Sequence, residues 1–401
     1  MVHRTEQNSK HDSNGLWLNK EGRRICYNPW THFEVNNTNG DVTMCCDVDT
    51  VLGNVNEQSI ESIWNSEEYQ QIRKQMYNDG ADKMCGSNCL LLNGTKNYQR
   101  FSWFRELDEN SDLYKNALLN ENEIREGKAC LSSYPRWMRF AISYKCNYNC
   151  YHCCQEDDRQ TNRKLPDSFI AEAKTYIDYY QFLFIFGGEP TLFREFPDLL
   201  KLAADNPHVR YGTVSNGSII HRHFAEIEKV NWAIICISLD AATENTYERL
   251  RRSKQWKRVN QNLQVISEIK KRNNFEFTIT MTVNSKNCNE IYDFVSLANH
   301  YNATPKMYLV SNPNKSFRFN HEYLSFNKKQ TAEILEQIER VSKDFPDIYN
   351  QTGLSVLKDH FRQYNRMRQV GNDLELAVRK ILPASFIKVI KNMKNSIRPP
   401  S

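Results

Sequence analysis

The chain has 401 residues, of which 40% are hydrophobic, and it carries a formal net charge of +5. This apolar content can bury a sizeable core, so the composition argues against global disorder, and the length suits two or three domains. The charge excess is too small to indicate a nucleic-acid partner, because that function needs a concentrated basic patch.

The sequence also lacks the features of a secreted or membrane-spanning chain. Its first 15 residues are polar, unlike the apolar core of a signal peptide. The longest apolar run covers residues 232–239 and is far shorter than the roughly 20 residues of a membrane span. We therefore expect a cytoplasmic protein with reduced thiols, in which clustered cysteines bind metal rather than form disulfides.

The N-terminal part predicts a disordered arm over residues 1–20 and a small cysteine-rich module over residues 21–100. The pair Asn39-Gly40 lies between two alternating segments and predicts a β-hairpin, and residues 59–77 predict a helix. Two distant pairs of cysteines flank these elements and could together close one metal site: Cys26, Cys45, Cys85 and Cys89. Zinc and an iron–sulfur cluster both fit four thiolates.

A connecting region over residues 101–133 leads to the largest predicted domain, residues 134–320. Here short apolar strands alternate with amphipathic helices, such as a helix over residues 166–180. The predicted strands cover residues 139–144, 182–186, 209–215, 232–239, 277–283 and 306–310. Six βα units in series predict an α/β fold with a parallel sheet, open or curled into a partial (βα)6 TIM-like barrel. The chemistry of such sheets lies at the carboxyl ends of the strands.

The C-terminal region, residues 321–401, is predicted to be helical. Its last segment, residues 386–398, spaces apolar residues three and four apart with lysines between them. This pattern permits weak contact with a membrane surface or docking of a partner, although a helix packed on the domain is the simpler interpretation.

Three cysteines directly follow the first predicted strand of the main domain, at the rim where the chemistry is expected. Cys146, Cys150 and Cys153 have the spacing C-x3-C-x2-C. A structural zinc site uses four ligands, whereas three thiolates on one loop suit a four-iron cluster with one iron left open for a substrate or cofactor. The neighbouring Cys154 is expected to pack beneath the loop rather than to act as a further ligand.

This spacing resembles that of the radical S-adenosylmethionine (SAM) superfamily, and later segments agree with it. The segment FGGEPTL follows the second strand and resembles the GGEP motif of the family. The segment VSNGS ends the third strand, and ISLDAATENTYERLR ends the fourth, as in the family. The resemblance covers about residues 134–312 and places four motifs at successive strand ends.

The resemblance implies a [4Fe–4S] cluster on Cys146, Cys150 and Cys153, and SAM bound to its open iron. Other residues of the motifs are then expected to contact the cofactor: His152, Gly187, Gly188, Glu189, Ser215, Asn216, Ser238, Asp240 and Arg251. The two glycines would let the backbone approach SAM, Glu189 would face its amine and Arg251 its carboxylate. His152 stands where many members of the family have an aromatic residue.

The N-terminal module resembles the SPASM/twitch auxiliary-cluster module of the same superfamily, through the segments CYNPW, NGDVTMCC and MCGSNC. The resemblance implies a second [4Fe–4S] cluster bound by Cys26, Cys45, Cys85 and Cys89. Cys46 would lie nearby or exchange roles with Cys45. In better-known relatives this module follows the radical domain, whereas here it precedes it.

Together these features imply an enzyme that cleaves SAM reductively to a 5′-deoxyadenosyl radical, which abstracts hydrogen from a substrate. An electron donor such as flavodoxin or ferredoxin would reduce the first cluster, and the auxiliary cluster would accept an electron from the substrate. A small hydroxylated or amino-sugar-like substrate is expected, and a peptide- or protein-modifying maturase is the alternative. A non-catalytic iron–sulfur protein is a third possibility, and it would require the cofactor motifs to be vestigial.

Overall fold

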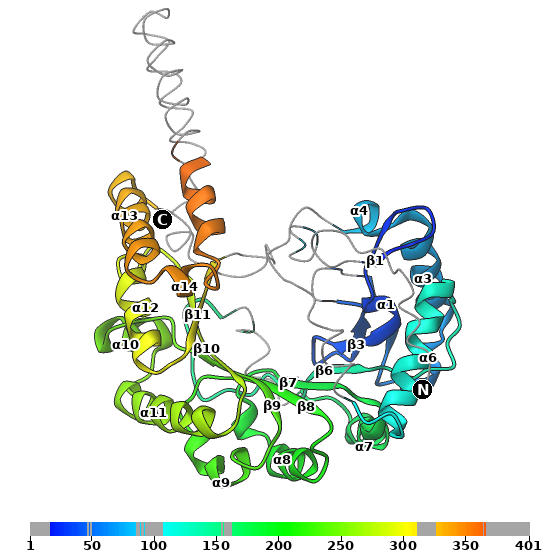
Figure 1. Cartoon of the computed structure of the whole chain (residues 1–401). Helices are drawn as coiled ribbons and strands as arrows, with labels where there is room; N and C mark the ends of the chain where they lie inside the picture. The colour runs from blue at the N-terminus through cyan, green and yellow to red at the C-terminus, as the bar shows by residue number, and fades with distance from the viewer. Residues whose placement is uncertain are drawn as a thin grey trace, which may run out of the picture.

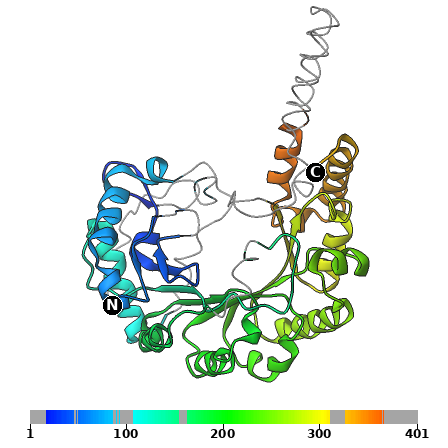
Figure 2. The same cartoon turned by 180° about the vertical axis from the view of Figure 1, so that it is seen from behind.

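The computed structural model describes residues 17–45, 48, 50–85, 89, 92, 107–153, 155, 163–310, 326–363 and 365. One nine-stranded sheet forms the centre of this part, with the strand order β11-β10-β9-β8-β7-β6-β3-β4-β5. The sheet curves into an open arc with most helices on its outer side (Figure 1, and from behind in Figure 2). The described strands do not close into a barrel, which agrees with the predicted open or partial barrel.

All six strands predicted for the main domain are present, and each runs parallel to its neighbours. They are β6 (Trp137–Ala141), β7 (Phe182–Phe186), β8 (Arg210–Ser215), β9 (Trp232–Ser238), β10 (Glu276–Val283) and β11 (Thr304–Leu309). The largest difference is at β6, which was expected over residues 139–144. It ends three residues earlier because the chain bends there into the segment that carries the cysteines.

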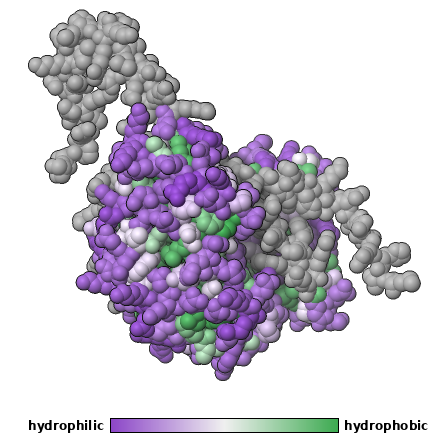
Figure 3. Space-filling model, turned by 60° about the vertical axis from the view of Figure 1, so that its left-hand side comes forward, coloured by the Kyte–Doolittle hydropathy of each residue, from purple (hydrophilic) through white to green (hydrophobic). Residues whose placement is uncertain are grey.

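The connections between these strands contain the helices of the outer layer. They are α7 (Asp167–Thr175), α8 (Phe196–Asp205), α9 (Phe224–Ile227), α10 (Glu244–Arg251), α11 (Trp256–Arg272) and α12 (Ile291–His300). Short 3₁₀ turns precede or follow some of them: η1 (Ile177–Tyr179), η2 (Pro190–Leu192) and η3 (Ile220–His223). The helix predicted over residues 166–180 is therefore α7 followed by η1. The side that carries α10 to α13 is mostly hydrophilic (Figure 3).

The N-terminal module extends the same sheet. Its strands are β3 (His32–Val35), β4 (Asp41–Thr43) and β5 (Gly53–Asn54). β3 pairs in parallel with β6, and β3 and β4 form the antiparallel hairpin that Asn39-Gly40 predicts. Gly40 has a φ of 89°, a backbone conformation that glycine adopts without a steric penalty. The module is thus continuous with the main domain.

The helices of the module differ from prediction at one point. The single helix expected over residues 59–77 is two helices, α2 (Ile60–Trp64) and α3 (Glu67–Asp79). The break occurs because the Ser66 hydroxyl accepts a hydrogen bond from the backbone N–H of Tyr69 and caps α3. Short elements complete the module: β1 (Trp17–Leu18), β2 (Arg24–Ile25), α1 (Asn28–Thr31) and α4 (Ala81–Met84).

Arg73 of α3 joins the module to the connecting region. Its guanidinium is buried, and it donates hydrogen bonds to the carbonyls of Pro29, Trp64 and Ala129 at 2.7–2.8 Å. The connecting region itself contains α6 (Asp112–Glu126). A buried ion pair between Arg136 and Glu121 ties α6 to the start of β6.

The two ends of the chain lie largely outside the described residues. A disordered arm was predicted over residues 1–20, but residues 17–20 are ordered, because Trp17 is buried and β1 pairs with β2. Residues 1–16 lie outside the described residues. The C-terminal region is helical as far as it is described, with α13 (Lys328–Asp344), α14 (Pro346–Tyr349) and a helical stretch over residues 354–363. The amphipathic segment 386–398 falls outside. None of the described helices is long and apolar enough to cross a membrane.

Candidate active site

The three cysteines of the C-x3-C-x2-C motif lie on one half-buried loop beyond the carboxyl end of β6, which we call the cysteine loop (residues 142–153). The backbone N–H of Cys153 donates to the carbonyl of Cys150 at 3.4 Å, so these two residues share one turn. The backbone N–H of Tyr148 lies 3.4 Å from the sulfur of Cys146. Cys154 lies outside the described residues.

Three cysteines on one loop suit an iron–sulfur cluster that keeps one iron open. Burial raises the pKa of the Cys146 thiol, and the N–H of Tyr148 and the charge of Arg251 act in the opposite direction. Thiolates are the ligands that such clusters need, and these neighbours favour the thiolate form.

Gly187 and Gly188 allow the loop after β7 to touch the cysteine loop. A Cβ on Gly188 would lie 2.3 Å from the carbonyl oxygens of Tyr144 and Lys145, and one on Gly187 would lie 2.3 Å from that of Ser143. The N–H of Gly188 donates to the Ser143 carbonyl at 2.9 Å. The glycines admit the backbone of the cysteine loop, and their expected close approach to SAM stays a prediction.

The Glu189 carboxylate is fully buried and already has four protein donors. They are the N–H and hydroxyl of Thr191, the hydroxyl of Ser215 and the N–H of Asn216, at 2.5–3.2 Å. Burial raises the pKa of Glu189, and these hydrogen bonds oppose that rise. Glu189 therefore joins the end of β7 to the end of β8. The expected contact with the SAM amine stays a prediction.

Asn216 connects the end of β8 to the cysteine loop. Its side-chain amide donates to the Asn147 carbonyl oxygen at 2.9 Å and lies 3.9 Å from the Cys146 sulfur. Asn147 in turn donates to the Ser218 hydroxyl. The sequence analysis missed Asn147, although its place between two motif cysteines was a signal that could have identified it.

Asp240 joins three further elements to the cysteine loop. Its carboxylate accepts hydrogen bonds from Arg251 at 2.8 Å, from His152 at 3.0 Å and from the N–H of Thr282 at 2.7 Å. Burial acts to raise the pKa of Asp240, but His152 and Arg251 hold it well below its usual range. Asp240 also has a φ of 63°, a strained conformation for a residue other than glycine.

Arg251 uses its guanidinium within the protein. Besides Asp240, it donates to the backbone carbonyl of Ser238 at 2.6 Å, and its own carbonyl lies 3.7 Å from the Cys150 sulfur. Its Nε and the Nδ1 of His152 are buried and have no hydrogen-bond partner among the described residues. Arg251 was expected to bind the SAM carboxylate in a bidentate fashion. That contact stays a prediction, and the bonds to Asp240 and Ser238 use two of the five N–H donors of the guanidinium. The side chain of Ser238 is half-buried beside it.

Three of the four auxiliary cysteines, Cys26, Cys45 and Cys85, lie close to the end of a secondary-structure element. Cys26 follows β2, and Cys85 follows α4. Hydrogen bonds between Arg24 and Asp82 join these two elements, so Cys26 and Cys85 come to the same side of the module. Cys45 lies two residues beyond β4, and Cys89 is also described, whereas Cys46 is not. Their assignment as cluster ligands stays a prediction.

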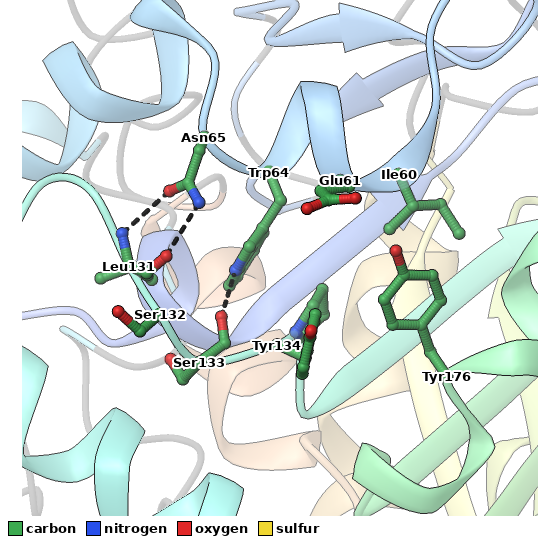
Figure 4. A pocket seen from close by; sticks show the side chains of 10 residues that line it. Ile60, Glu61, Trp64, Asn65, Leu131, Ser132, Ser133, Tyr134 and Tyr176 are labelled. Atoms are coloured by element: carbon green, nitrogen blue, oxygen red, sulfur yellow. Dashed lines mark hydrogen bonds between the residues drawn. The ribbon is translucent and has the colours of Figure 1, made fainter.

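A small pocket lies between the module and the main domain, away from the cysteine loop (Figure 4). Its volume is about 160 Å³, and it is lined by residues of α2, of the segment 131–135 and by Tyr176. Residues 131–135 lead into the amino end of β6, the end opposite the cysteine loop. The pocket is therefore separate from the candidate active site.

Two family models match the chain. Residues 140–298 match the radical SAM superfamily, and residues 26–90 match an iron–sulfur cluster-binding domain, SPASM. The chain therefore contains a radical SAM domain, and a SPASM-type iron–sulfur cluster-binding domain precedes it. These two domains imply SAM and two [4Fe–4S] clusters as cofactors.

Among curated relatives, GTP 3′,8-cyclase of Synechocystis sp. is 21% identical over 208 residues, which cover 47% of this chain and 59% of the relative. Mycofactocin maturase MftC of Mycolicibacterium smegmatis is 26% identical over 179 residues, or 42% of this chain and 43% of the relative. The chain thus spans less than two thirds of the curated relatives that it matches.

Solved structures of Streptococcus suis SuiB also resemble the chain. SuiB bound to the precursor peptide SuiA is 13% identical with a TM-score of 0.44, over 78% of this chain and 68% of that one.

Proposed function

We propose that this enzyme cleaves SAM reductively at a cluster held by Cys146, Cys150 and Cys153 and oxidises its substrate after hydrogen abstraction. These three cysteines would hold the cluster, which would supply the one electron needed for reductive cleavage of the SAM sulfonium and so for hydrogen abstraction from the substrate. The observation that carries the proposal is that hydrogen bonds attach the cysteine loop to the ends of three neighbouring strands. Gly188 and Glu189 provide these bonds after β7, Asn216 after β8 and Asp240 after β9.

The residues of the chain have separate parts in this proposal. Gly188 and Asn216 position the cysteine loop, and Asp240 orients Arg251 and His152 beside it. The Nε of Arg251 and the Nδ1 of His152 are buried and have no partner among the described residues, so both are available for a hydrogen bond with the cofactor. Residues 134–320 form the catalytic domain, and residues 21–100 hold the auxiliary cluster through Cys26, Cys45, Cys85 and Cys89. That cluster supplies an acceptor for the electron that the substrate loses.

We propose a small hydroxylated or amino-sugar-like molecule as the substrate. Support comes from relatives named as GTP 3′,8-cyclases, whose substrate is a small hydroxylated molecule. The maturase MftC supports the second candidate, the modification of a peptide. Both reactions require reduced clusters, which agrees with a cytoplasmic location.

Anaerobic reconstitution tests the reaction itself. The full chain should bind about eight irons, as expected for two four-iron clusters. With dithionite and SAM it should release 5′-deoxyadenosine, measured by liquid chromatography. If the cluster is intact but SAM is not cleaved, the proposed enzymatic activity is refuted, and a non-catalytic iron–sulfur protein is favoured.

The substrate class is tested with fractions of a bacterial extract. The fraction that speeds release of 5′-deoxyadenosine is treated with protease or left untreated before the assay. Stimulation that survives protease supports the small molecule. Stimulation that protease destroys supports the peptide and rejects our first candidate.

A further inference from the structure

Exposed cations gather at the rim beside the cysteine loop. They lie on η3, at the end of α10, in the turn that follows and at the start of α11. We name them the basic rim surface: Arg222, Arg249, Arg252, Lys254, Lys257 and Arg258. Residues 249–258 contain no acidic residue.

The basic rim surface touches the cysteine loop directly. The Arg252 guanidinium lies over the ring of Tyr151, 3.6 Å from its centre, and the Tyr151 N–H donates to the carbonyl of Leu250 at 3.1 Å. Tyr151 stands between two of the motif cysteines, and its side chain is 43% exposed. The basic rim surface therefore contacts, through Arg252, an exposed aromatic side chain that belongs to the cysteine loop.

The charges of this surface are not neutralised within the part of the chain that the structure describes. The buried Arg251 pairs with Asp240, whereas its six exposed neighbours form no ion pair with a described acidic residue. His221 lies between two of these cations and contacts Arg258 at 3.3 Å. Burial, and then the charges of Arg258 and Arg222, lower the pKa of His221, as expected where positive charge is concentrated.

We infer that the basic rim surface docks a small acidic electron-carrier protein, which passes one electron to the cluster on the cysteine loop. The inference rests on the proposed function. Each cleavage of SAM consumes one electron, and the substrate cannot supply it because it is oxidised only after that cleavage. The carrier is oxidised by one electron, and the cluster is reduced by one. Complementary charge would steer the carrier to the exposed Tyr151 and raise the association rate, with a strong dependence on ionic strength.

The test reverses three charges of this surface whose side chains have no hydrogen bond or ion pair with other described residues: Arg222→Glu, Lys254→Glu and Lys257→Glu. A matched control reverses three exposed lysines on other elements: Lys201→Glu, Lys229→Glu and Lys343→Glu. The reconstituted full-length proteins are mixed anaerobically with reduced flavodoxin, an acidic carrier. Bleaching of the cluster absorbance is followed by stopped flow, with dithionite as a second reductant.

We expect the rim variant to lose at least about tenfold in its reduction rate by flavodoxin, and to lose the salt dependence of that rate. Reduction by dithionite should change less than about twofold, and the control variant should behave as the wild type for both reductants. An unchanged flavodoxin rate in the rim variant would overturn the inference, as would an equal loss in the control. An equal loss with dithionite would also overturn it, because the cations would then support the loop rather than a partner.

The absorbance readout separates this inference from the proposed function. If the wild type is reduced but does not cleave SAM, the proposed function fails while the docking result stands. A nucleic acid is the other anionic partner to check, with a labelled 20-nucleotide single strand at physiological salt. Binding that the rim variant abolishes, together with an unchanged flavodoxin rate, would assign the surface to nucleic acid and reject the carrier.

Discussion

In the cysteine loop, hydrogen bonds from three strand ends position the segment that carries three cysteines, whereas in the N-terminal module backbone pairing fixes the elements that carry the auxiliary cysteines. The loop depends on Glu189, Asn216 and Asp240, each of which joins parts of the chain that lie far apart in sequence. The module depends on the pairing of β3 with β6 and on one buried guanidinium, that of Arg73. A single substitution should therefore disturb the loop more selectively than the module.

The largest effect is expected from removing a ligand of the first cluster. Cys146→Ala should reduce release of 5′-deoxyadenosine to the level of the assay without enzyme, because a four-iron cluster on two thiolates of one loop is not retained. Chromatography of the reaction mixture measures this. The matched control is Cys130→Ala, since Cys130 is exposed and lies outside both sets of cysteines. Full activity in Cys146→Ala would remove the cysteine loop from the mechanism.

The corresponding change in the module should act differently. Cys85→Ala should lower the iron content from about eight to about four per chain and abolish product, because the substrate then lacks its electron acceptor. Release of 5′-deoxyadenosine should continue within about threefold of the wild type, as uncoupled cleavage. If Cys85→Ala forms product at the full rate, the auxiliary cluster is not an electron acceptor.

A smaller but selective effect is expected at Asp240. Asp240→Asn removes the charge that pairs with the buried Arg251, and breaking such a pair costs about 3–5 kcal/mol. Asparagine tolerates a positive φ, so the substitution leaves the backbone conformation accessible. Chemical denaturation measures the loss of stability, and iron analysis should show that the first cluster is depleted while the auxiliary cluster is retained.

The control for Asp240→Asn is a variant that replaces one hydrogen-bond donor to Asp240 but keeps the ion pair between Asp240 and Arg251. His152→Gln keeps a hydrogen-bond donor near the carboxylate and should cost less than Asp240→Asn. Equal iron content in Asp240→Asn and the wild type would show that the carboxylate does not position the cysteine loop.

The sequence was sufficient to predict the architecture of the main domain, because its strands are short apolar segments and the helices between them show a clear amphipathic periodicity of apolar residues. It was not sufficient for the module, since the parallel pairing of β3 with β6 joins residues about 100 positions apart. The motif residues were found, but several of their partners were not. Glu189 and Gly188 carry a family motif, yet their contacts with Ser215 and Tyr144 depend on how β7, β8 and the cysteine loop meet in space.

The smallest effect concerns Cys236, a core thiol of β9 that belongs to neither set of cysteines. Burial raises its pKa from 9.0 to about 11, because the folded interior disfavours the thiolate. The resulting stabilisation is fully present below pH 9 and is lost as the pH rises from 9 to 11. Over this window the free energy of unfolding of the wild type should fall by up to about 2 kcal/mol more than that of Cys236→Ala.

Urea denaturation at pH 8.5, 10 and 11 under reducing conditions measures this difference. The comparison uses the slope with pH, because the cavity left by Cys236→Ala shifts the stability equally at every pH. The exposed Cys130→Ala variant should keep the slope of the wild type. If Cys236→Ala keeps that slope too, then Cys236 does not titrate as a buried core thiol. Cys236 would then have to be reconsidered as a member of one of the two proposed sets of cluster ligands.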